Sequence, residues 1–292
     1  MPKPYHDGFP RSARLGDRAV RQARRAAALC RPPYPDMDSR IHDSRKRAKK
    51  LRSLLRMAAP ARPGAVRQSD RRIAAAARDL GKTRDSAARL ECLDRLIACT
   101  DAPEDKADLR LLRGILADRT RGHAHAVDGA RALKGFRRAM ERTEKALRAW
   151  PSDAFGPGTV RRGLLAGYRD ARTAWKQARA APDADHLHDW RKALQTHRHQ
   201  MRLLAPAPGT RHARRCDRLD GLADLLGDDH DLAMLEDYIH RDRTALPRRA
   251  VSAAVRASRH QSARLRAEAF AVGETLFRRK PKAFLRRLTA SL

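Results

Sequence analysis

The sequence predicts an all-α fold, and three observations lead to this prediction. Ala, Leu, Arg, Lys and Gln dominate the 292-residue chain while β-branched residues are scarce, which favours helix over strand. Apolar residues recur with the helical period, and no segment alternates apolar and polar residues over the length of a strand. Clusters of Pro and Gly interrupt this pattern. With 41% hydrophobic residues, the chain is apolar enough to bury a core.

These Pro and Gly clusters separate the predicted helices in order along the chain. They lie at 31–35, 60–64, 151–158, 181–182, 206–209 and Pro247. The helices, with ends placed to within about four residues, are expected over 12–30, 39–58, 66–81, 84–100, 104–121, 124–149, 159–180, 185–204, 210–226, 229–244, 249–273 and 281–290.

The two halves of the chain resemble each other. Sliding the sequence by 146 positions places Ile41–Lys46 on Leu187–Lys192, and the match continues without a gap for about 45 residues, which include shared His, Arg, Pro and Gly. The sequence therefore predicts an internal duplication: one helical-bundle repeat in 1–150, a linker at 151–158 and a second repeat in 159–292. Two antiparallel helical bundles related by a pseudo-two-fold axis are expected.

The repeated helix carries a cationic stripe on one face, opposite an apolar face. The first copy of the stripe, at i, i+3, i+7, i+10 and i+14, consists of His42, Arg45, Lys49, Arg52 and Arg56. The second copy, in which Gln195 replaces the middle lysine, consists of His188, Arg191, Lys192 at its border, Arg198, His199 and Arg202. A solvated face normally mixes Glu with Lys, and Glu is absent from both stripes. Since a helix of about 18 residues is roughly 27 Å long, the stripe suits a linear anion.

Neighbouring helices carry further basic rows, which either extend this track or are exposed surface. Before the first copy these are Arg14, Arg18, Arg21 and Arg25, and before the second they are Arg162, Arg169, Arg172 and Lys176.

The histidines of the stripe are expected in the first turn of their helices, after caps at Asp38 or Ser39 and at Asp185. There an imidazole beside phosphate gains charge, so this interpretation predicts tighter anion binding at mildly acidic pH. The other interpretation is a hydrogen bond to Asp43 or Asp189.

Two aspartates follow Leu-Gly by four positions in both copies. We expect Asp85 and Asp231 to orient the cations of the stripe, with helix capping as an equally good explanation.

The charge balance points to a polyanionic partner. The chain has 65 Lys and Arg against 34 Asp and Glu, which gives a formal charge of +31. In a compact fold this charge causes electrostatic repulsion that bound anions or counterions must neutralise. A GC-rich coding sequence would also enrich Arg and Ala.

Several classes of protein are not supported by the sequence. It has no GxxxxGKS/T, GxGxxG or HExxH motif and no serine in an elbow motif, so we expect no enzyme, no cofactor and no metal site. The longest apolar runs have about five residues, far fewer than a membrane span needs, and the first ten residues do not form a secretory signal. A cytoplasmic protein is expected, with its four cysteines as buried hydrophobes.

The segments His42–Arg52 and His188–Lys192 resemble the HxxRKxxKxxR signature of the CHAD (conserved histidine α-helical domain) family. Gly163–Arg172, Leu226–Leu232 and Lys280–Phe284 also resemble it, in the family's order, so the resemblance spans about 12–290. It implies two helical bundles about a basic cavity, binding of inorganic polyphosphate and association with polyphosphate granules. The ligand-facing set that it implies is His42, Arg45, Lys46, Lys49, Arg52, Arg56, His188, Arg191, Lys192, Arg198 and Arg202. The chain lacks the ExExK signature of the CYTH triphosphatase domain that often accompanies the family.

Three functions are therefore open. The leading hypothesis is non-enzymatic binding of inorganic polyphosphate, which the 4% aromatic content favours, because binders of single-stranded nucleic acid usually stack bases on aromatic rings. The alternative is nonspecific binding of nucleic acid. The third is an enzyme acting on polyphosphate or a nucleotide, with Asp85 or Asp231 holding a divalent metal.

Overall fold

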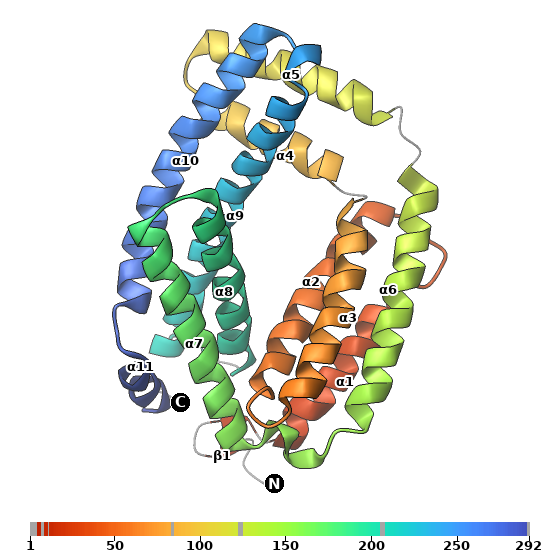
Figure 1. The fold of residues 1–292 in the computed structure, drawn as a ribbon, viewed down its shortest axis with the longest axis vertical. Helices are drawn as coiled ribbons and strands as arrows, with labels where there is room; N and C mark the ends of the chain where they lie inside the picture. Colours follow the sequence, from red (N-terminus) through yellow and green to blue (C-terminus); the bar gives the residue numbers. More distant parts are fainter. Residues whose placement is uncertain are drawn as a thin grey trace.

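The protein folds into helices that are joined by short connections (Figure 1). The computed structural model describes residues 5–6, 9–10, 12–82, 85–121, 125–204 and 208–290. The α-helices in this part of the chain are α1 (Ser12–Ala28), α2 (Met37–Met57), α3 (Pro63–Lys82), α4 (Asp85–Cys99), α5 (Pro103–Arg121), α6 (His125–Arg148), α7 (Pro157–Ala180), α8 (Ala184–Leu203), α9 (Arg211–Arg241), α10 (Arg248–Phe277) and α11 (Pro281–Thr289).

The remaining elements are small. Two 3₁₀ helices, η1 (Ser152–Phe155) and η2 (Arg243–Ala245), follow α6 and α9. Two strands of two residues each, β1 (Tyr5–His6) and β2 (Phe9–Pro10), pair antiparallel near the N-terminus. The prediction of an all-α fold is confirmed apart from this short ladder. No helix in the described ranges is both long enough and apolar enough to cross a membrane.

One predicted break between helices is wrong. The sequence predicts separate helices over 210–226 and 229–244, but α9 runs through Gly227 and its neighbours without interruption. Tertiary contacts hold this segment helical: Leu226, Asp229 and Leu232 are buried, and Asp229 accepts a hydrogen bond of 2.8 Å from Arg266 Nε of α10.

The predicted N-caps are also wrong, by about half a turn each. Asp36 caps α2 by accepting from the backbone N–H of Ser39, and Asp183 caps α8 by accepting from the N–H of His186. Only the first four N–H groups of a helix lack an internal partner. His42 is the sixth residue of α2 and His188 the fifth of α8, so neither histidine lies in the first turn, where backbone N–H groups are open to an anion.

Two hydrophobic clusters form the core. The larger one joins α1, α2, α3, α6, α7 and α8 with the start of α9, the end of α10 and α11. The second joins α4 and α5 with the later part of α9 and the earlier part of α10. Both clusters draw residues from each side of 151–158, so helices far apart in the sequence lie side by side (Figure 1).

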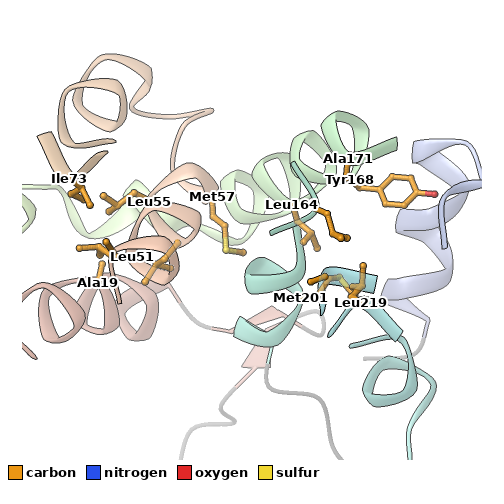
Figure 2. Packing of buried hydrophobic residues seen from close by; sticks show 14 of the residues in the cluster. Ala19, Leu51, Leu55, Met57, Ile73, Leu164, Tyr168, Ala171, Met201 and Leu219 are labelled. Atoms are coloured by element: carbon orange, nitrogen blue, oxygen red, sulfur yellow. The ribbon is translucent and has the colours of Figure 1, made fainter. Parts of the chain in front are cut away.

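The larger cluster is continuous across the middle of the molecule. Figure 2 shows Met57 of α2 between Leu55 on one side and Leu164 of α7 on the other. The helices α2 and α7 approach closely here, because Gly163 of α7 has no side chain: a Cβ at this position would overlap the backbone of Met57. This close approach helps to set the position of α2, which carries the first basic stripe.

We therefore expect Gly163→Ala to lower the free energy of unfolding by about 1–3 kcal/mol, because the added methyl group overpacks the contact between α2 and α7. The measurement is urea denaturation followed by circular dichroism. Gly135→Ala in α6 is the control: nothing lies within 4 Å of a Cβ there, so the stability should rise by up to about 1 kcal/mol. If Gly163→Ala were as stable as the wild-type protein, the close contact between Gly163 and the backbone of Met57 would be contradicted.

Candidate anion-binding site

A groove of about 440 Å³ lies between α2, α3 and α8. Seven Arg and Lys side chains line it, together with His188, His199 and small polar or apolar residues. No carboxylate lines it among the residues that the structure describes. The seven cationic residues are Arg45, Lys49, Arg52, Arg56, Arg78, Arg191 and Lys192.

The two long sides of the groove are amphipathic helices that pack against each other. In α2, Ile41, Ala48, Leu51 and Leu55 are buried, so the basic residues that alternate with them turn away from the core. In α8, Leu187, Trp190, Leu194 and Met201 are buried in the same way. Apolar burial of both helices thus turns two basic stripes toward one groove.

Asp70 of α3 holds two arginines of the first stripe. Arg52 donates to both of its carboxylate oxygens, at 2.7 and 3.1 Å, and Arg56 Nη2 donates to Oδ2 at 3.1 Å. Burial opposes ionisation of Asp70, but the hydrogen bonds from Arg52 and the charge of Arg56 outweigh it and lower the pKa of this carboxyl. Arg56 also donates to Thr196 Oγ1 of α8 at 2.8 Å, so the arginine bridges the two helices.

Asp220 of α9 holds the corresponding arginines of the second stripe. Arg198 Nε donates to Oδ1 at 2.5 Å, and Arg202 Nε donates to Oδ2 at 3.0 Å. Arg202 also donates to Asp217 at 2.8 Å. Neither Arg198 nor Arg202 lines the groove, since these contacts draw their guanidinium groups toward α9.

Arg45 lies against α3, where its Nη1 donates to the carbonyl of Ala77 at 3.1 Å. Gly81 makes this position possible, because a Cβ on Gly81 would overlap the guanidinium group. The Leu-Gly pair shared by the two halves therefore has a packing role in the first half. In the second half, a Cβ on Gly227 would meet nothing within 4 Å.

Arg191 is a partly desolvated arginine of the groove. It is partly buried, and its Nε is buried without a hydrogen-bond partner in the described part of the chain. Desolvation lowers its pKa, the charge of Asp231 raises it, and Arg45 lowers it further.

Asp231 itself accepts a hydrogen bond of 2.9 Å from Arg95 Nη2 of α4, and no described hydrogen bond joins it to the stripe. Its charge still acts on Arg191 and Lys49, so it influences the stripe through space. The side chain of Asp85, the other predicted orienting carboxylate, lies outside the described residues.

Lys49 has a markedly altered acidity. Desolvation lowers its pKa to about 8, with further lowering by Arg191, Arg45 and Arg198, against which Asp231 acts. An anion bound in the groove would raise the pKa of Lys49, because it would place negative charge beside the amine and offset the positive charges of the neighbouring arginines.

Three histidines in or next to the groove have lowered pKa values. Desolvation, Lys192 and Arg191 lower the pKa of His188, whose ring stacks on His230 at 5.1 Å between centroids. Desolvation and Arg191 lower the pKa of His230 to about 4, and desolvation and Arg198 lower that of His199 to about 3. In the ligand-free protein, protonation of His188 is therefore shifted to more acidic pH.

The structure brings seven of the predicted site residues to the groove and places the others elsewhere. Those at the groove are Arg45, Lys49, Arg52, Arg56, His188, Arg191 and Lys192. His42, Lys46, Arg21, Arg25 and Arg169 are exposed and do not line it. Arg172 donates through Nε to the carbonyl of Phe277 at 2.9 Å, at the end of α10.

Sequence reasoning missed three residues that shape this site. Arg78 lines the groove from α3, and Asp70 and Asp220 hold the arginines. The 146-residue register does not reveal the two aspartates, because Asp70 corresponds to Cys216 and Asp220 lies one turn further on. Their positions opposite the stripe in antiparallel helix pairs are the only signal that could have found them.

The fold and this groove define an all-α protein with a concentration of Arg and Lys between two packed helices. A family model described as the CHAD domain matches residues 14–240, so the chain belongs to the CHAD domain family, as its motifs predict. No catalytic domain is identified beside it. None of the curated proteins matches the chain.

The fold is similar to the crystal structure of the CHAD domain from the plant Ricinus communis. The TM-score is 0.58 and the sequence identity 16%, over 100% of this chain and 98% of that chain. At this identity the likeness concerns the fold.

The altered acidity of Lys49 can be tested by NMR titration of its methylated amine. We expect a midpoint near pH 8. Arg191→Gln should raise this midpoint, because it removes a neighbouring positive charge, and Asp231→Asn should lower it, because it removes a negative one. Shifts of the same sign in both variants would contradict the electrostatic arrangement of the groove.

Proposed function

We propose that this protein binds inorganic polyphosphate, without catalysis, in the groove between α2, α3 and α8. The observation that carries the proposal is the set of seven cationic side chains with no carboxylate among the groove residues that the structure describes. Asp70 and Asp189 pair with Arg52, Arg56 and Lys192 from outside the lining. The cations still outnumber these carboxylates, and a positive potential in a concave site favours a ligand with many negative charges.

The form of the groove suits a chain of phosphates. Arg45, Lys49, Arg52 and Arg56 recur at every turn along α2, and Arg191 and Lys192 face them from α8. Arginine binds phosphate oxygens in a bidentate way, while lysine acts as a point charge. Neutralising successive phosphates releases counterions, which supplies affinity in a salt-dependent way.

The groove favours bare phosphate over nucleic acid. Its described lining contains no Phe, Tyr or Trp on which a base could stack. A ligand that offers phosphate and nothing else needs no such platform.

The other predicted residues are proposed as an extension of the groove for a long chain. These are His42, Lys46, Arg198 and Arg202 on the two stripe helices and Arg21, Arg25, Arg169 and Arg172 on the helices before them. Binding of long chains would bring the protein to polyphosphate granules in the cytoplasm.

We also propose that the two halves are copies around this basic cavity, divided at 151–158. The bounds of the elements support this: shifting α1, α2 and α3 by 146 positions brings them close to the starts of α7, α8 and α9. Helices that correspond in this register also pack against each other, as α2 does on α8 and α5 on α10.

Charge reversal in the groove tests the function. Lys49→Glu with Lys192→Glu should weaken binding of long-chain polyphosphate at least about tenfold, since two charge-assisted contacts are lost and repulsion is added. Lys192 is exposed, and the partly desolvated Lys49 lies near Arg45, Arg191 and Arg198, whose charges can accommodate a carboxylate, so folding should not change. Lys134→Glu with Lys145→Glu on α6 is the matched control, with the same change in net charge away from the groove. Equal weakening by both pairs, measured by calorimetric titration, would contradict the proposal.

Salt dependence and competition separate polyphosphate from nucleic acid. With five to seven phosphate contacts, the logarithm of the association constant should fall with the logarithm of salt concentration with a slope of about −4. Single-stranded DNA of matched charge should displace polyphosphate poorly. Equal displacement by DNA of matched charge would contradict a preference for polyphosphate and would favour nucleic acid as the ligand.

A further inference from the structure

A second hollow, of about 510 Å³, lies between the start of α9, the end of α10 and α11. Its volume falls in the range of about 300–1,000 Å³ that is usual for small-molecule sites. Its described lining contains no Asp or Glu and contains seven arginines: Arg211, Arg214, Arg215, Arg218, Arg278, Arg279 and Arg287. It shares no lining residue with the groove.

Arg215 is the most buried cation of this hollow. Its guanidinium group lies over the ring of Phe284, 4.8 Å from the centroid, and Nη2 donates to the carbonyl of Leu276 at 3.0 Å. Its Nε is buried and has no hydrogen-bond partner in the described chain. Burial lowers the pKa of Arg215 to about 10, which still leaves it charged at neutral pH. A buried charge without a carboxylate partner is costly unless an anion compensates it.

The end of α10 explains only part of this arginine cluster. Carbonyl groups at a helix C-terminus attract cations, and those of Leu276 and Phe277 accept from Arg215 and Arg172. Arg211, Arg218, Arg278 and Arg279 are exposed around the hollow, and no described ion pair joins them to a carboxylate. Like charges so close together are unfavourable without a ligand.

We propose that this hollow is a second anion site, which takes a compact, multiply charged phosphate ion such as tripolyphosphate against Arg215 and the arginines around it. Arginine suits this ligand, because its planar group donates two parallel hydrogen bonds to phosphate oxygens. Phe284 and Leu276 add apolar surface to the lining beside the arginines. The proposal does not depend on polyphosphate binding in the groove.

Calorimetric titration with tripolyphosphate tests the site in the groove variant Lys49→Glu/Lys192→Glu, where the first site is weakened. We expect this protein to retain one tripolyphosphate site. Adding Arg218→Glu and Arg279→Glu should weaken that site at least about tenfold, because both exposed side chains line the hollow. Adding Lys134→Glu and Lys145→Glu instead, with the same change in net charge, should leave it nearly unchanged.

Two outcomes would overturn the second site: no tripolyphosphate binding in the groove variant, or equal weakening by the arginine and lysine pairs. Failure of the groove itself is distinguishable, because Lys49→Glu/Lys192→Glu would then bind long-chain polyphosphate as the wild type does. Titrating long-chain polyphosphate into the same proteins distinguishes two sources of the ligand in the hollow. Weakening by the arginine pair would show that the end of a long chain also binds there, and no weakening would show that the hollow takes only the short free ion.

The Nε–H resonance of Arg215 gives a direct measurement. Since this group has no hydrogen-bond partner within the described residues, a bound phosphate should shift its ¹H and ¹⁵N signals in proportion to occupancy. Arg215→Lys should keep the charge and lose the bidentate contact, so tripolyphosphate affinity should fall in this variant too. An unshifted Arg215 signal at saturating tripolyphosphate would also contradict the proposal.

Discussion

The packing of α2 against α8 is the contact on which the candidate site depends. Both helices bury one apolar face, and both turn a basic face toward the same groove. Two described hydrogen bonds cross the contact: Arg56 donates to Thr196 Oγ1 at 2.8 Å, and Gln200 Nε2 donates to the carbonyl of Ser53 at 3.4 Å. Burial of apolar surface on both helices offsets the repulsion between the two basic stripes.

The carboxylates are placed where they position cations without filling the groove. Asp70 and Asp220 each hold two arginines that lie one helical turn apart, and Asp231 holds Arg95 while its charge reaches Arg191. These ion pairs order the guanidinium groups that take part in them. Lys49 and Arg191 line the groove without a described hydrogen bond to a carboxylate. This division suits a site whose counterions come from a ligand.

The core explains how two basic halves stay together in one chain. The helices α4 and α5 pack on α9 and α10, whereas α2 and α7 meet at the backbone contact of Met57 with Gly163. Each hydrophobic cluster thus contains residues from both sides of 151–158. Opening the groove by separating the halves would expose apolar surface in both clusters, so the groove is set by the same packing that stabilises the fold.

The sequence by itself determined the all-α class, the family and most of the helices, because helical periodicity, Pro and Gly breaks and the His-Arg-Lys motif are local properties. It also determined which face of α2 and α8 is basic. Only the tertiary structure decided that α9 continues through Gly227, since buried Asp229 and its bond to Arg266 hold it there. Tertiary packing likewise brought Arg78 to the groove and drew Arg198 and Arg202 toward Asp220. It also gathered seven arginines from the start of α9, the end of α10 and α11 around one hollow. Contacts between distant helices depend on how whole elements pack, and no local pattern encodes that.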